Sequence, residues 1–335
     1  MTHSYCKITL NPLSFDSEKK SGYSRAGIRA LFGTGTANPV LTMSRSELIQ
    51  NFKTNKNRMS ISGAQPKRSA ILTGKTIELT DTGGQYILKP SPEEYPYLAE
   101  VEHTCMVLAH QLSSGGRLTI ANNGLVELSD GELAYITRRF DRLPDGTKLQ
   151  QEQMDAVMGI TNKYDQNVSY ERIGQFIRDI VAVPLPALMA YFEQVLIAYI
   201  LGNDDFHIRN LGLLVDLNTG KPTGLTPAYD IVASYLYPSD TGFMALPLTI
   251  EDEEDQKGET EGIAVYGYYT GGDFLDLGTG IGLSLPVARK IMLRVLASVP
   301  AAQELQKRSF MPQNMKVELN NLMNDRAQML NKMNP

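Results

Sequence analysis

The stretch that decides the fold is Leu201–Leu211, which reads LGNDDFHIRNL. It directly follows a segment whose apolar residues recur at helical spacing from Leu185 to Ile200, the pattern of a buried helix. Two aspartates, one histidine and two asparagines then stand in one short loop. Such residues bind hard metal ions or move protons, so the loop is the candidate centre of chemistry.

The spacing within this loop indicates phosphoryl transfer. Asp205 and Asn210 are five residues apart, as in a kinase catalytic loop, where the aspartate accepts the proton of the attacking hydroxyl and the asparagine binds Mg²⁺. Mg²⁺ needs a further oxygen ligand, and Asp230 is the candidate. We expect residues 211–215 and 222–227 to form a hairpin that returns Asp230 to the loop.

A cation for the phosphates of ATP is expected at Lys89, which ends the strand-like segment 84–89. Kinases carry their phosphate-binding lysine on a strand and pair it with a glutamate of the next helix. A helix is expected over 97–112, and Glu102 near its start is placed to pair with Lys89.

The pattern changes along the chain from strands to helices, which predicts an α+β, two-lobed, protein-kinase-like fold. Residues 1–145 form the expected β-rich N-lobe with a nucleotide-covering loop and a hinge, and 146–335 the mostly helical C-lobe with the catalytic and metal-binding loops. Further expected elements are a hairpin of 69–73 and 76–79, strands at 125–128 and 132–137, and helices at 44–52 (capped by Ser44), 286–296 and 315–333.

Composition favours an ordinary soluble, intracellular protein. The net charge of −5 gives no sign of a nucleic-acid coat or a membrane anchor. The longest apolar run, near Val195–Leu201, is far shorter than a membrane span, and no signal peptide is visible. Cys6, near an expected loose terminus, and Cys105, in a helix, do not suggest a disulfide framework.

Several motifs in order resemble the HipA family of bacterial toxin kinases. The family's Ser-x-x-Gly-x-Gln-x-Lys loop is similar to Ser60–Lys67, its Asp-x-His-x-(Lys/Arg)-Asn loop to Asp205–Asn210, its Tyr-Asp pair to Tyr229-Asp230, its Arg-Phe-Asp-Arg hinge to Arg139–Arg142, and its Gln-Glu-Asp-like stretch to Gln151–Gln153. Each motif alone is weak, and their joint order and spacing is specific.

The resemblance implies a serine/threonine kinase that uses ATP and Mg²⁺. Asp205 would be the catalytic base, and Asn210 and Asp230 would hold the metal. Ser60 and Ser62 would be autophosphorylation sites. The residues that the resemblance places around the nucleotide are Ser60, Ser62, Gly63, Gln65, Lys67, Lys89, Glu102, Arg138 and Phe140 (through their backbone), His207 and Tyr229.

The early position of Ser60 is similar to the short, HipT-type branch of the family. That branch implies a HipS-like small antitoxin that supplies a missing N-terminal subdomain, and a HipB-like DNA-binding antitoxin. It also implies an aminoacyl-tRNA synthetase, the tryptophanyl enzyme, as the substrate whose phosphorylation arrests growth. A cytoplasmic protein without membrane or direct nucleic-acid binding is expected.

Three alternative functions remain open at this point. Gly278–Gly282 resembles the glycine loop of S-adenosylmethionine-dependent methyltransferases, although we expect a loop between helices there because no sheet can follow it. A pseudokinase scaffold and a metal-dependent hydrolase using Asp205 and His207 are the further alternatives. The acidic run Glu251–Asp255 is expected to be a solvated loop, and Asp204 a loop or capping residue.

Overall fold

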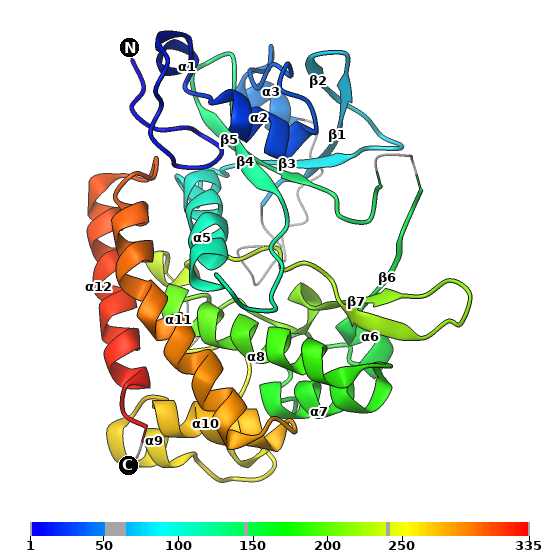
Figure 1. Ribbon diagram of the computed structural model, residues 1–335, viewed down its shortest axis with the longest axis vertical. Helices are drawn as coiled ribbons and strands as arrows, with labels where there is room; N and C mark the ends of the chain where they lie inside the picture. The colour runs from blue at the N-terminus through cyan, green and yellow to red at the C-terminus, as the bar shows by residue number, and fades with distance from the viewer. Residues whose placement is uncertain (1, 51–64, 144–146, 239–241, 334–335) are drawn as a thin grey trace. The chain divides into compact units, whose positions relative to one another are not determined.

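The computed structural model describes residues 2–50, 65–143, 147–238 and 242–333 (Figure 1). The chain divides into two compact units. Unit 1 comprises Met1–Leu108, Ala121–Arg142 and Glu304–Lys316, and unit 2 comprises Ala109–Ile120, Leu143–Gln303 and Val317–Pro335.

Unit 1 is built on a five-stranded antiparallel sheet in the order β2-β1-β3-β5-β4. The predicted hairpin is confirmed, with Gly74 at φ 63° in the turn between β1 and β2, where a left-handed residue is needed. The predicted helix over 97–112 is α5. The elements are β1 (Arg68–Thr73), β2 (Thr76–Leu79), β3 (Tyr86–Pro90), α5 (Leu98–Leu112), β4 (Asn123–Glu127) and β5 (Leu133–Arg138).

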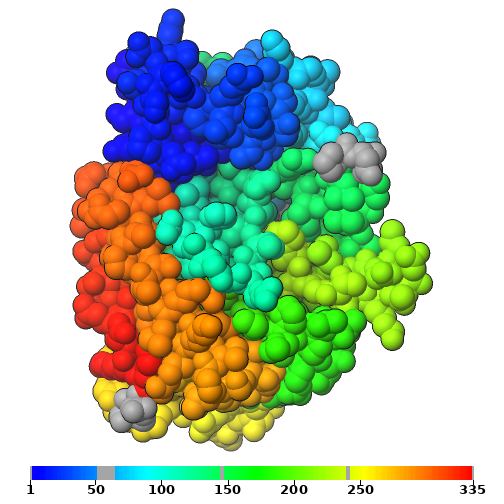
Figure 2. All heavy atoms as spheres, in the orientation of Figure 1, coloured from blue at the N-terminus to red at the C-terminus, as the bar shows by residue number. Residues whose placement is uncertain are grey.

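The first fifty residues form a packed layer on this sheet, which the polar composition did not predict. They carry α1 (Asp16–Ser21), α2 (Arg25–Phe32) and α3 (Arg45–Gln50), and their atoms form a continuous blue surface in Figure 2. The capping box of α3 is present, since Ser44 N donates to Glu47 Oε2 (2.7 Å) and Glu47 N to Ser44 Oγ (3.3 Å).

The prediction of a loose terminus around Cys6 is wrong. Cys6 and Ile8 are 0% and 4% exposed and share one apolar core with strand residues such as Leu88. Polar contacts fix the segment as well. Lys7 Nζ lies 2.6 Å from Glu127 Oε2, and the carbonyl of Lys7 accepts a hydrogen bond from the backbone of Leu125. The sequence did not indicate this burial, because Cys6 and Ile8 flank Lys7, a charged residue that is also buried.

Unit 2 is mostly helical, with one three-stranded antiparallel sheet in the order β6-β7-β8. The expected hairpin before Asp230 is confirmed as β7 and β8. The elements are β6 (Gln150–Gln153), α6 (Met154–Met158), α7 (Tyr170–Ile180), α8 (Pro184–Leu201), η1 (Ile208–Asn210), β7 (Gly212–Val215), β8 (Pro222–Leu225), η2 (Ser234–Leu236), η3 (Ile250–Asp252), α9 (Glu261–Tyr266), α10 (Gly271–Gly280), α11 (Leu285–Gln306) and α12 (Gln313–Leu330).

Helix α8 is the apolar centre of unit 2. Its 18 residues are long and apolar enough to cross a membrane by length and composition, with a mean hydropathy of 1.4, although the continuous apolar run near Val195–Leu201 is shorter. However, 78% of the helix is buried inside the structure, and a core helix gives the same hydropathy pattern. Glu193, fully buried within it, is held by Arg294 at 2.7 Å.

The expected loop between helices is confirmed only in part, because the glycine-rich stretch is helical up to Gly280, and Ile281 and Gly282 lie in the turn before α11. Gly278 and Gly280 lie in the last turns of α10, and Ala288 of α11 packs against Gly278. A Cβ on Gly278 would come within 2.6 Å of the Ala288 Cβ. The glycine therefore permits close helix packing. The element before α10 is the helix α9, whereas a methyltransferase loop follows a strand.

The acidic run Glu251–Asp255 is also not a solvated loop throughout. Glu253 is 1% exposed and forms an ion pair with Arg172, while its Oε1 accepts from the backbone of Ser169 at 2.9 Å. Asp252 closes a capping box with Thr249 at the start of η3. Charge composition alone could not show that these carboxylates cap and pair with α7 and η3.

Candidate active site

A buried ion pair in unit 1 joins the sheet to α5. Nζ of Lys89 lies 2.5 Å from Oε1 of Glu102, and the two side chains are 3% and 0% exposed. Lys89 Nζ also stands 5.2 Å from the ring centroid of Tyr135, its cross-strand neighbour on β5. The pairing expected from the sequence is therefore present, and it fixes both the lysine head group and the helix.

The Arg139–Arg142 motif lies at the end of unit 1 as a compact ion cluster. Arg139 holds Asp141 with two hydrogen bonds of 2.9 and 2.8 Å, and Arg142 Nη1 lies 2.5 Å from Asp141 Oδ2. Burial raises the pKa of Asp141, but the two arginines outweigh it and keep that pKa below its ordinary value. The cluster fixes the turn that these residues form.

The candidate catalytic loop begins at the end of α8. Gly202 ends this helix in the left-handed region at φ 65°, where its backbone N–H bonds to carbonyls of the last turn. A side chain on Gly202 would collide with Leu322, since a Cβ would lie 2.3 Å from its Cδ2. The chain then turns through Asn203–His207 before the short helix η1. Glycine is thus required twice at this position, for conformation and for space.

Asp205 is held on several sides within unit 2. Its backbone N–H donates to Ser234 Oγ at 3.1 Å, and its Oδ1 accepts a hydrogen bond from the hydroxyl of Tyr164. His207 Nε2 lies 4.0 Å from the same oxygen. Burial, aided by the charge of Lys163, lowers the pKa of His207 to about 4, so this imidazole is neutral at pH 7. Only 11% of the Asp205 side chain is exposed.

Asn210 and Asp230 are the expected metal ligands, and their local structure fits a cation. Asn210 is 3% exposed, and within the described residues its Oδ1 has no hydrogen-bonding partner. Asp230 has φ 53°, a conformation that costs a non-glycine residue free energy and often marks functional sites. A buried amide oxygen and a carboxylate are the oxygen ligands that Mg²⁺ prefers.

Arg209 and Tyr229 support this part of the loop. Arg209 Nε lies 2.6 Å from Asp155 Oδ2, and its Nη2 donates to the carbonyl of Thr161 at 3.1 Å. The hydroxyl of Tyr229 donates to the carbonyl of Arg209 at 3.2 Å. Burial is the main cause that raises the pKa of Tyr229 above its ordinary value, so it remains a neutral donor.

The other predicted nucleotide-site residues belong to unit 1. Gln65 is buried at 3% exposure and Lys67 is exposed. Arg138 ends β5, and its backbone N–H donates to the carbonyl of Asn122, so this N–H is engaged within the sheet. Phe140 follows in the turn that carries the ion cluster. The remaining predicted residues lie outside the described part of the chain and are Ser60, Ser62 and Gly63.

Sequence reasoning missed two residues that contact the loop. Tyr164 reaches Asp205 from the connection between α6 and α7, and Asp155 reaches Arg209 from α6. Both residues are far from Asp205 in the sequence, so their spacing did not indicate a contact with the loop. Asp155 was detectable in principle, because it follows the Gln151–Gln153 stretch, which pairs with β7 beside the loop.

Comparison with known proteins places the chain in a family. The family model of the HipA-like C-terminal domain matches residues 59–303. This chain belongs to the HipA-like family. A Haemophilus influenzae protein named "Putative kinase" is 36% identical over 323 residues, which cover 92% of each chain. A Sinorhizobium fredii protein, "Putative kinase Y4dM", is 27% identical and aligns with 57% of this chain and 49% of its own length.

Solved structures of kinase type share the fold. HipA from Shewanella oneidensis, determined in a complex with HipB and operator DNA, matches with a TM-score of 0.65 and 20% identity over 86% of this chain and 71% of its own. The proinflammatory kinase CtkA from Helicobacter pylori matches with a TM-score of 0.53 and 12% identity over 89% and 96% of the two chains. The predicted α+β, kinase-like fold is confirmed.

Proposed function

We propose that this HipA-like protein is a kinase that transfers the γ-phosphate of ATP to a serine or threonine hydroxyl of a protein. The observation that carries the proposal is the loop that holds Asp205 five residues before Asn210, followed by Asp230 in a left-handed conformation. Family membership supports the same conclusion, since its relatives in Haemophilus and Sinorhizobium are named as kinases.

Each residue has one role in this proposal. Asp205 accepts the proton of the attacking hydroxyl, and Lys89, oriented by Glu102, binds phosphate oxygens of ATP. Asn210 and Asp230 hold Mg²⁺, which when bound neutralises charge on the phosphates. Among the described residues no three His, Cys, Asp or Glu side chains form a metal cluster. Mg²⁺ in kinases typically takes one or two protein ligands and completes its shell with phosphates and water.

The cellular role is proposed from family membership. The protein acts in the cytoplasm as the toxin of a toxin–antitoxin system and phosphorylates an aminoacyl-tRNA synthetase, the tryptophanyl enzyme. A HipB-like antitoxin is the expected partner, as the similar Shewanella HipA forms a complex with HipB and operator DNA. A HipS-like partner and autophosphorylation of Ser60 and Ser62 complete the proposal for a HipT-type member.

The proposal is tested by phosphoproteomics in bacteria that express the wild type or Asp205→Asn. Wild type is expected to arrest growth and to raise serine or threonine phosphorylation on a tRNA synthetase, and excess of that synthetase is expected to restore growth. Asp205→Asn preserves side-chain volume and is expected to do neither. Growth arrest that persists with Asp205→Asn would instead support a pseudokinase scaffold.

A further inference from the structure

A tyrosine that no part of the proposed mechanism uses lies on the proposed base. The hydroxyl of Tyr164 donates to Oδ1 of Asp205. The ring of Tyr164 packs edge-on against His207, with centroids 5.3 Å apart, and Lys163 Nζ stands 4.6 Å from its centroid. The ring that carries this hydroxyl is therefore contacted by both His207 and Lys163.

This hydrogen bond has the same chemistry as the one that an acceptor must make. In phosphoryl transfer the serine or threonine hydroxyl donates its hydrogen to the catalytic aspartate before attack. Only 11% of the Asp205 side chain is exposed, and His207 lies 4.0 Å from the same oxygen. Tyr164 therefore occupies Oδ1 of a carboxylate that is already largely covered.

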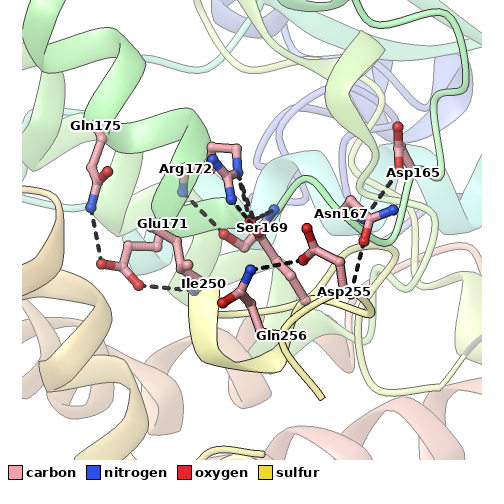
Figure 3. Close-up of polar contacts among 10 residues, drawn as sticks. Asp165, Asn167, Ser169, Glu171, Arg172, Gln175, Ile250, Asp255 and Gln256 are labelled. Atoms are coloured by element: carbon pink, nitrogen blue, oxygen red, sulfur yellow. Dashed lines mark hydrogen bonds and ion pairs between the residues drawn. The ribbon is translucent and has the colours of Figure 1, made fainter. Parts of the chain in front are cut away.

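The loop that carries Tyr164 is fastened on both sides. Upstream, the carbonyl of Thr161 accepts from Arg209 at 3.1 Å. Downstream, the carbonyl of Gln166 accepts from the backbone of Glu254 at 3.0 Å, and Asn167 Oδ1 accepts from the backbone of Asp255 at 3.0 Å. Figure 3 shows Asn167 joined to Asp255, and also the contact of Glu171 with Ile250. The acidic segment Glu251–Asp255 thus holds this loop in place through the backbone of Glu254 and Asp255.

We propose that Tyr164 occupies the place of the acceptor hydroxyl on Asp205, and that an acceptor must displace it before phosphate transfer. Tyr164 thereby selects acceptors that can displace the loop that carries it, and it disfavours attack by water. The inference rests on the proposed kinase function, because it assigns Asp205 as the base. It goes beyond that function by naming the group that competes with the acceptor.

Hydrolysis of ATP tests the proposal without a known protein substrate. Asp205 takes a proton from water, the water oxygen bonds to the γ-phosphorus, the bond from that phosphorus to the bridging oxygen breaks, and ADP and phosphate leave. Tyr164→Phe keeps the ring against His207 and leaves an oxygen-sized space on the carboxylate. Because a hydrogen bond to a charged group must no longer be broken, we expect kcat for hydrolysis to rise about tenfold.

Two further variants provide a control and a test of the loop contact. Tyr191→Phe removes a buried tyrosine hydroxyl that donates to the carbonyl of Tyr170 and does not reach Asp205, so it is expected to leave hydrolysis unchanged. Asn167→Ala removes the side-chain oxygen that accepts a hydrogen bond from the backbone of Asp255. It should raise hydrolysis less than Tyr164→Phe does, and it should add nothing when the two are combined, because both act through one contact.

The outcomes separate this proposal from the function on which it rests. Faster hydrolysis by Tyr164→Phe, with KM for ATP and thermal stability close to those of the wild type, supports displacement. A slower or equal rate, while the wild type still transfers phosphate to protein, overturns displacement and leaves the kinase function intact. If calorimetry detects no ATP binding, and neither the wild type nor any of the variants hydrolyses ATP, both proposals are wrong.

Discussion

Replacing Glu102 with glutamine tests how the buried ion pair supports the phosphate-binding lysine. The substitution keeps the shape of the side chain but leaves the ammonium of Lys89 at 3% exposure beside a neutral amide. Removing one partner of a buried pair typically costs about 3–5 kcal/mol, because the other charge stays buried without compensation. For a domain of about 150 residues, this corresponds to a fall of roughly 10 °C in Tm.

The matched control removes both charges. Lys89→Met combined with Glu102→Leu should recover most of the lost stability, since apolar replacement of a whole buried pair is often neutral or stabilising. Circular dichroism melting reports stability, and calorimetric titration reports ATP affinity. We expect ATP affinity to fall in both variants. In Glu102→Gln the lysine is no longer oriented by a carboxylate, and the double variant has no lysine. A Glu102→Gln protein that melts within about 2 °C of the wild type and binds ATP normally would refute the reasoning.

Three further results are expected. Asp230→Asn should weaken Mg²⁺-dependent ATP binding at least about tenfold, with little change in Tm, because a carboxylate is lost from a cation site; calorimetry with and without EDTA measures this. Burial lowers the pKa of His103 to about 4 from 6.5, so its stabilising contribution is full above pH 6.5 and is lost as the pH falls toward 4. Urea unfolding at pH 7 and pH 5 should show that the wild type loses about 2 kcal/mol more than His103→Gln; equal losses would show that His103 is not buried neutral. Gly278→Ser should cost about 1–3 kcal/mol by overpacking Ala288, yet leave ATP affinity unchanged, and tight S-adenosylmethionine binding by the wild type would contradict this assignment.

The candidate catalytic loop could be proposed from the sequence because its residues are close together in the chain. Asp205 and Asn210 lie on one short segment. A lysine near the end of a strand, followed by a helix with an early glutamate, is an arrangement typical of kinases. The sheet and α5 could likewise be predicted, since their apolar residues follow periods of two and 3.6.

The missed features depend on contacts between distant segments. Tyr164 reaches Asp205 across 41 residues, and Glu253 reaches Arg172 across 81. No periodicity reports such pairs. Gly278 was expected in a loop because glycine is common in loops, and the sequence does not show that this glycine permits close packing of two helices. Cys6 was misread because a short segment can be buried without a long apolar run.

Transfer of labelled γ-phosphate from ATP to protein, measured with the pure wild type, Asp205→Asn and Asp204→Asn, tests the central claim most directly. The account predicts Mg²⁺-dependent label on serine or threonine with the wild type, loss of that label with Asp205→Asn, and retention with Asp204→Asn, because only Asp205 has an asparagine five residues later. Normal labelling by Asp205→Asn would contradict the account.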